Sequence, residues 1–162
     1  MDIDREINSI VAATKAENFR SALSQCAVLI ERWPDAPEAW RHKAYVHAQM
    51  KNYDLAVEAM SRAIEFAPNE PAYYMLRGRY LLMLSDNESA SENFTQVLEL
   101  CDQLQSDYHR EVAHFLRAES YVRLCRFDDA LRDCEDVRDE FRMWIDSLRT
   151  KRDIVERCRN RN

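Results

Sequence analysis

The feature that most constrains this sequence is a repeat of 34 residues. Ala22, Ala56 and Ala90 are separated by that interval, and an insertion of six residues before the last copy brings Ala130 into the same column. A period of this length is typical of stacked supersecondary units that each bury one face against the next. We therefore expect four repeats, at residues 3–36, 37–70, 71–104 and 111–144.

The composition indicates an all-α fold. The chain has 162 residues, which is the length of one domain, and it contains a single glycine and four prolines. So little glycine leaves no material for hairpins or glycine-rich loops. We expect a single domain over residues 1–162, with each repeat folded as two amphipathic helices.

The second repeat shows the pattern within one unit. Apolar residues recur at helical spacing from Trp40 to His47 and again from Tyr53 to Ile64. Asn52 lies between them and suits a turn, because asparagine tolerates left-handed backbone. A small residue in each first helix faces a small residue in the second, which lets the two helices approach closely; these residues are Ala44, Gly78 and Ala118 in the first helices and Ala56, Ala90 and Ala130 in the second.

This pattern resembles the tetratricopeptide repeat, and the resemblance covers about 142 residues. It is carried by the series Trp40, Ala44, His47, Ala56, Met60, Ala63 and Pro68. It implies a right-handed superhelix, an α-solenoid of antiparallel helix pairs, whose first helices line a concave groove. It also implies a scaffold that binds other proteins.

The last residues differ in charge from the rest of the chain. Residues 147–162 carry six basic and two acidic side chains, although the whole chain has a net charge of −6. We expect residues 145–158 to form a capping helix that covers the last apolar face. The alternative is that this segment is a basic anchor for RNA or an acidic partner.

The expected partner site is the exposed stripe of the first helices in repeats two to four. It combines apolar residues with spaced cations: Arg41, His42, Tyr45, Met75, Arg79, Leu82, Met83, Phe115, Glu119 and Arg123. Apolar anchors would supply most of the affinity, and the arginines would select carboxylates. The helix from Tyr73 to Leu84 is apolar almost all round, so its extra surface is either buried by the six-residue insert or left as an exposed patch. A pairing of Arg79 with Glu119 is the competing structural interpretation.

These residues predict a protein or peptide partner with acidic and apolar character. The negative charge argues against nucleic acid, and no stretch of sequence is apolar enough to span a membrane. A two-carboxylate clamp for chaperone tails is rejected, because the positions that match it hold unsuitable residues: Ile7, Val11, His42, Ala72 and Leu76 in repeats one to three, or Arg41, Tyr45, Leu76, Val112 and Leu116 in repeats two to four.

No catalytic, cofactor or metal motif is present, so we expect a non-enzymatic protein without cofactors. His47 and His114 fall in core-facing columns and are interpreted as packing residues. The acidic N-terminus lacks the features of a signal peptide, and five cysteines without a Cys-x-x-Cys pair fit a reduced, cytoplasmic protein. Cys26 and Cys134 are expected to be buried.

Three functions agree with these residues. The first is an adaptor that takes a peptide or helix of a partner protein in its groove. The second is a dedicated chaperone or inhibitor of one client, similar to the small acidic tetratricopeptide chaperones of type III secretion. The third is a structural module that forms a homodimer.

Overall fold

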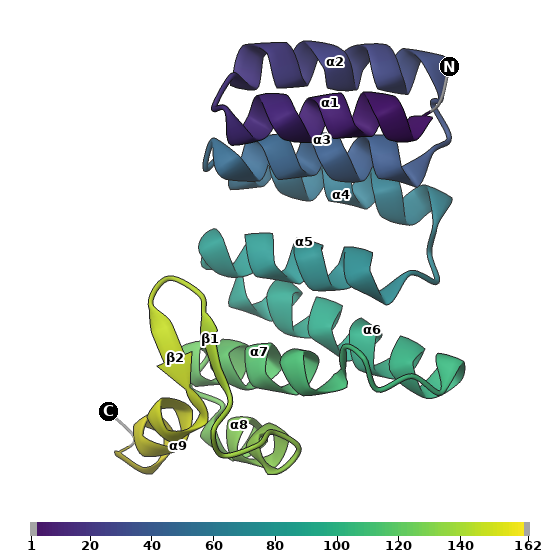
Figure 1. Ribbon diagram of the computed structural model, residues 1–162. Coiled ribbons are helices and arrows are strands. Elements are labelled where there is room, and N and C mark those ends of the chain that lie inside the picture. The colour runs from purple at the N-terminus through teal and green to yellow at the C-terminus, as the bar shows by residue number, and fades with distance from the viewer. Residues whose placement is uncertain (1–2, 161–162) are drawn as a thin grey trace. The chain divides into compact units, whose positions relative to one another are not determined.

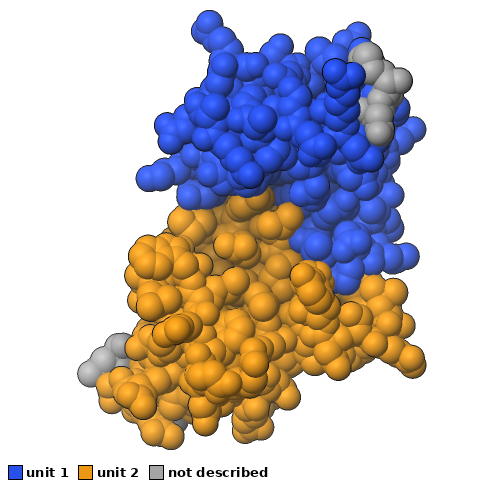
Figure 2. All heavy atoms as spheres, in the orientation of Figure 1, with its two compact units in different colours: residues 1–73 blue, residues 74–162 orange. Residues whose placement is uncertain are grey.

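The computed structural model describes residues 3–160, so the first two and last two residues of the predicted domain lie outside it (Figure 1). Its elements in chain order are α1 (Ile3–Lys15), α2 (Phe19–Arg32), α3 (Pro37–Gln49), α4 (Tyr53–Phe66), α5 (Pro71–Met83), α6 (Asn87–Leu104), α7 (Arg110–Arg123), α8 (Phe127–Glu135), β1 (Arg142–Trp144), β2 (Leu148–Thr150) and α9 (Lys151–Asn160). The chain divides into two compact units, residues 1–73 and 74–162, which Figure 2 colours separately. The prediction of one domain stays a prediction, because each unit is described by itself.

The predicted helix pairs are confirmed. Each expected repeat contains two consecutive helices joined by a short turn, from α1 and α2 in residues 3–36 to α7 and α8 in residues 111–144. The second helix of repeat three is longer than its counterparts, since α6 has 18 residues and α2 and α4 have 14 each, and it ends at Leu104, before the six-residue insert. The handedness of the expected superhelix stays a prediction.

The C-terminal segment differs from the prediction. Residues 145–150 are not helical, because β1 and β2 form an antiparallel hairpin whose turn is 145–147. The cap therefore begins at Lys151 rather than at residue 145. Its start is fixed by a capping box, in which the Asp153 backbone N–H donates to Thr150 Oγ1 over 3.2 Å and the Thr150 backbone N–H donates to Asp153 Oδ2 over 2.8 Å.

The small-residue columns are buried, as expected. Ala44, Ala56, Ala90, Ala118 and Ala130 are completely buried. The two cysteines of the same pattern, 26 and 134, are also buried, and burial raises their thiol pKa values to about 11 and about 12. All five cysteines are free thiols. Close helix approach and apolar burial thus coincide along the repeat.

Four turns within the repeats contain a residue in the left-handed region. They follow the repeat interval and are Glu17 (φ 56°), Lys51 (φ 60°), Ser85 (φ 62°) and Cys125 (φ 59°). In each turn the next residue donates its backbone N–H to a carbonyl five positions earlier, as in a Schellman motif; Asn52, for example, donates to His47 over 2.9 Å. The expectation of a left-handed Asn52 was one residue off, because Asn52 has φ −85° and precedes α4 as its N-cap.

Lys51→Gly should stabilise the protein by about 1 kcal/mol, because a side chain in the left-handed region costs about that much and glycine does not incur that penalty. Urea unfolding measures the change. Asn52→Gly is the matched control, because φ at that position is negative, and it should give no gain. Equal effects of the two substitutions would contradict the assigned turn.

The one glycine of the chain lies where α5 meets α6. A Cβ atom at Gly78 would lie 2.7 Å from Cε1 of Phe94, whose side chain is completely buried. Gly78→Ala should therefore destabilise the protein by about 1–3 kcal/mol through overpacking, although alanine is the better helix former. The shift in urea midpoint measures this, and Glu99→Ala, at an exposed position of α6, serves as the control. An increase in stability would show that α5 and α6 can separate at no cost.

Candidate partner-binding surfaces

In residues 1–73, the predicted site consists of three residues of α3. Arg41 and Tyr45 are partly exposed, whereas His42 is buried. Burial and then the charge of Arg41 lower the pKa of His42 to about 4, so its imidazole is neutral at pH 7. Arg41 Nη2 lies 2.7 Å from His42 Nε2. His42 therefore helps to orient the Arg41 side chain. Because its own ring is buried, His42 is not available to a ligand.

A surface depression between α2 and α3 was missed by the sequence reasoning. It has a volume of about 440 Å³, and its apolar lining includes Leu23, Ile30 and Trp40. Lys43 and Glu31 supply charge at its margin. The spacing of Leu23, Ala27 and Ile30, three or four residues apart along α2, was the available signal.

In residues 74–162, the four predicted residues of α5 differ in exposure. Met75 and Leu82 are buried, Arg79 is exposed, and Met83 exposes 38% of its surface. The apolar residues at the end of this helix are thus partly buried and partly exposed. Leu81 and Leu82 are buried, whereas Met83 and Leu84, which directly follows α5, are exposed. Arg79 and Met83 lie one helical turn apart and form the accessible part of the predicted site on α5.

The predicted residues of α7 do not line an open groove. Phe115 is fully buried and its ring centroid lies 4.9 Å from that of Phe141, which precedes β1. Glu119 is also fully buried, and Arg123 is largely covered. The segment after α8 folds back over this side of α7 (Figure 1). The expectation failed here because the hairpin had been assigned to a helix.

Glu119 lies at the centre of a charge network between α7 and the C-terminal segment. Its Oε1 accepts from Arg123 Nε over 2.8 Å, and its Oε2 accepts from Arg157 Nη1 over 2.8 Å. Arg149 lies 3.9 Å from the same carboxylate. The network accounts for Glu119, and the alternative pairing with Arg79 is not needed to neutralise it.

Arg123 extends this network to the turn of the hairpin. Its guanidinium donates to Asp146 Oδ2 over 2.8 Å and to the Leu82 carbonyl over 3.3 Å, in addition to its bond with Glu119. Burial alone would raise the pKa of Asp146, but a hydrogen bond from Ser147 and the charges of Arg123 and Arg149 hold it below its ordinary value. Arg123 was expected to bind an acidic partner. Its guanidinium is instead bonded to the carboxylate of Asp146 in the same chain.

The two histidines that were expected to be packing residues, His47 and His114, lie among residues of the protein core. His47 is buried, and burial is the main cause that lowers its pKa. His114 Nδ1 lies 2.9 Å from Oδ1 of the buried Asp133, which also accepts from Arg117. Among residues 3–160 there is no group of three metal-ligating side chains, and no helix in that range is long and apolar enough to cross a membrane.

Comparison with known protein families gives a match at residues 10–71, to the family described as tetratricopeptide repeat. Residues 10–71 are thus similar to tetratricopeptide repeats. The match covers most of the first predicted repeat and all of the second. Comparison with curated proteins gives no match.

Solved structures extend the similarity over more of the chain. A MamA structure from Desulfovibrio magneticus RS-1 gives a TM-score of 0.65 at 19% identity, over 83% of this chain and 71% of that chain. Another MamA crystal structure gives 0.72 at 12% identity, over 83% and 70%. The TPR2B domain of yeast Sti1, in a complex with pHsp70, gives 0.66 at 14% identity, over 73% and 94%. At these identities the similarity shows a fold of tetratricopeptide-repeat type.

Glu119→Gln should lower the free energy of unfolding by about 1–3 kcal/mol, because it removes the charge of the fully buried carboxylate to which Arg123 and Arg157 donate. Urea unfolding followed by circular dichroism measures the loss. Glu111→Gln is the control, because Glu111 bonds the exposed Arg138, and that pair should contribute about 0–1 kcal/mol. A Glu119→Gln variant as stable as the control would show that the network has no role in holding the C-terminal segment.

Proposed function

We propose that the protein is a non-enzymatic interaction scaffold that binds a peptide or helix of a partner protein. The family supports the general class, because tetratricopeptide repeats are protein-interaction modules, and residues 10–71 match that family. The observation that carries the proposal is that first helices present a cation beside an apolar side chain. Arg41 accompanies Tyr45 on α3, and Arg79 accompanies Met83 on α5.

The chemistry of these pairs selects the kind of partner. A guanidinium binds a carboxylate through two parallel hydrogen bonds, and Tyr and Met adapt to apolar side chains. A segment that alternates acidic and apolar residues therefore complements each pair. Phe115, Glu119 and Leu82 are left out of the proposed site, because they are buried. Localisation in the cytoplasm belongs to this proposal, as does a partner that is neither a nucleic acid nor a membrane.

The solved complex of the Sti1 domain with pHsp70 is a precedent for a protein ligand on this fold. The ligand of the present chain would be held differently, because Ile7, Val11, Ala72 and Leu76 occupy clamp positions that need polar side chains. A dedicated chaperone or inhibitor remains the alternative within the same chemistry. A homodimeric module is the alternative that needs no second protein.

Arg79→Glu and Met83→Asp test this proposal. Immobilised wild-type protein and each variant are incubated with lysate of the source cells, and retained proteins are quantified by mass spectrometry. We expect a set of proteins to be depleted about tenfold on both variants, since a few anchors dominate such interfaces. The melting temperature should be unchanged, because both side chains are exposed.

Arg20→Glu is the matched control for the change of charge, because Arg20 is an exposed arginine on the second helix of another repeat. It should retain the wild-type set. If all variants retain the same proteins, the surface of α5 is not the site. If sedimentation shows a wild-type dimer that Met83→Asp dissociates, the homodimeric alternative replaces the proposal.

A further inference from the structure

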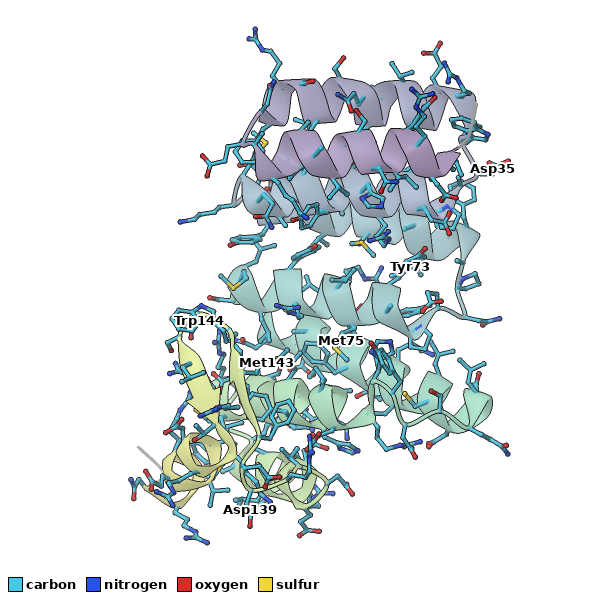
Figure 3. The ribbon with its side chains drawn as sticks, in the orientation of Figure 1. Asp35, Tyr73, Met75, Asp139, Met143 and Trp144 are labelled. Atoms are coloured by element: carbon cyan, nitrogen blue, oxygen red, sulfur yellow. The ribbon has the colours of Figure 1, made fainter. Side chains whose placement is uncertain are left out.

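The C-terminal hairpin turns two large apolar side chains toward solvent. Trp144 pairs with Leu148 across the strands, and their exposed fractions are 68% and 52%. Because side chains alternate along a strand, this pair lies on the opposite face from Met143 and Arg149, which also pair and are partly buried. Figure 3 shows Trp144 at the outer end of the hairpin, next to the turn. The outer face of the hairpin is thus apolar at its tip.

The hairpin is bonded to the rest of the C-terminal unit at its base and at its turn. A two-stranded hairpin alone is marginally stable in water. Here Lys151 Nζ, directly after β2, donates to the Val137 carbonyl over 2.7 Å and to Asp139 over 2.9 Å. At the turn, Asp146 is bonded to Arg123 over 2.8 Å. Both ends of the hairpin are therefore fixed, so Trp144 is presented in a defined position.

The outer face of the hairpin also carries a cation. Arg142 lies on the same face as Trp144 and is exposed. Of the four acids between residues 139 and 153, three are engaged, Asp139 by Lys151, Asp146 by Arg123 and Asp153 by Thr150, whereas Glu140 is exposed before β1. A ligand on the outer face therefore meets arginine and apolar surface together.

We propose that the outer face of the hairpin, formed by Arg142, Trp144 and Leu148, is a second docking surface for an acidic segment of another protein. Aromatic and arginine side chains are the usual anchors of protein interfaces. The fixed hairpin reduces the entropy lost on binding, because the anchor is ordered beforehand. The occupant carries an apolar side chain for the Trp144–Leu148 pair and a carboxylate for Arg142. The three residues of this surface are not among those of the site proposed on α3 and α5.

A displayed library of random 12-residue peptides, selected on the intact protein, tests the proposal. Clones that bind wild type are counted again on Trp144→Ser, Leu148→Ser and Arg142→Glu. We expect a class of clones rich in Asp and Glu with one or two large apolar residues, whose affinity falls about tenfold or more on each variant. The blue shift of Trp144 emission on addition of a selected synthetic peptide gives a second readout.

Matched controls separate this effect from general loss of exposed apolar surface. Tyr108→Ser removes an aromatic side chain that is 83% exposed, and Leu104→Ser removes a leucine that is 54% exposed. Both should bind the selected clones like wild type. Arg79→Glu should also bind them like wild type, so failure of the hairpin surface and failure of the α5 surface are distinguishable.

Four outcomes would overturn the proposal. The first is a selection in which no clone depends on Trp144, and the second is a Trp144-dependent class rich in Lys and Arg. The third is a wild-type dimer in sedimentation that Trp144→Ser dissociates, which would make a second copy the occupant. The fourth is Trp144-dependent binding to vesicles of phosphatidylserine and phosphatidylcholine, which would make the hairpin a membrane contact.

Discussion

The close approach of paired helices is the constraint on which this fold depends. Small residues recur at the crossing points, and Gly78 lies at one of them, where the ring of Phe94 is too close for a Cβ atom. Such packing fixes which side of each helix is buried, because the close crossing is possible only where small residues face each other. The remaining sides can then carry any residue that function requires. Arg79 and Met83 use this freedom on α5, whose opposite side includes Gly78.

Much of this arrangement was predictable because it is local and repeated. The interval between alanines identified the helix pairs, and several columns agreed on the register. The C-terminal hairpin was not predicted, although its signals were present: Trp144 and Ile145 favour strands, and Thr150 with Asp153 forms a capping box. The need of a repeat array for a helix over its last apolar face had suggested a helix extending from residue 145. A capping motif with definite geometry was better evidence than composition.

The candidate site was predicted less well, because its exposure depends on contacts between residues distant in sequence. Phe115 is covered by Phe141, and Glu119 is bonded by Arg157, which is 38 residues away. Helical periodicity correctly places Phe115, Glu119 and Arg123 on one side of α7. It says nothing about which segment lies over that side. Arg79 and Met83 remained accessible, so the part of the prediction on α5 keeps its physical basis.

The way the repeats end explains why the hairpin is available for binding. The last first-helix, α7, is covered partly by apolar contacts of Phe141 and partly by ions centred on Glu119. A buried ion network contributes little net stability compared with apolar packing, but it places its members definitely, because each partner has one favourable position. The hairpin uses its inner face for this network, with Arg149 directed to Glu119 and Asp146. Successive side chains of a strand point to opposite faces. When the inner face of the hairpin is held in place, Trp144 and Leu148 on the other face therefore point to solvent. The exposure of Trp144 and Leu148 is therefore a consequence of how the C-terminal segment covers α7. Their position is set by the ion pairs of Arg149 on the opposite face of the hairpin.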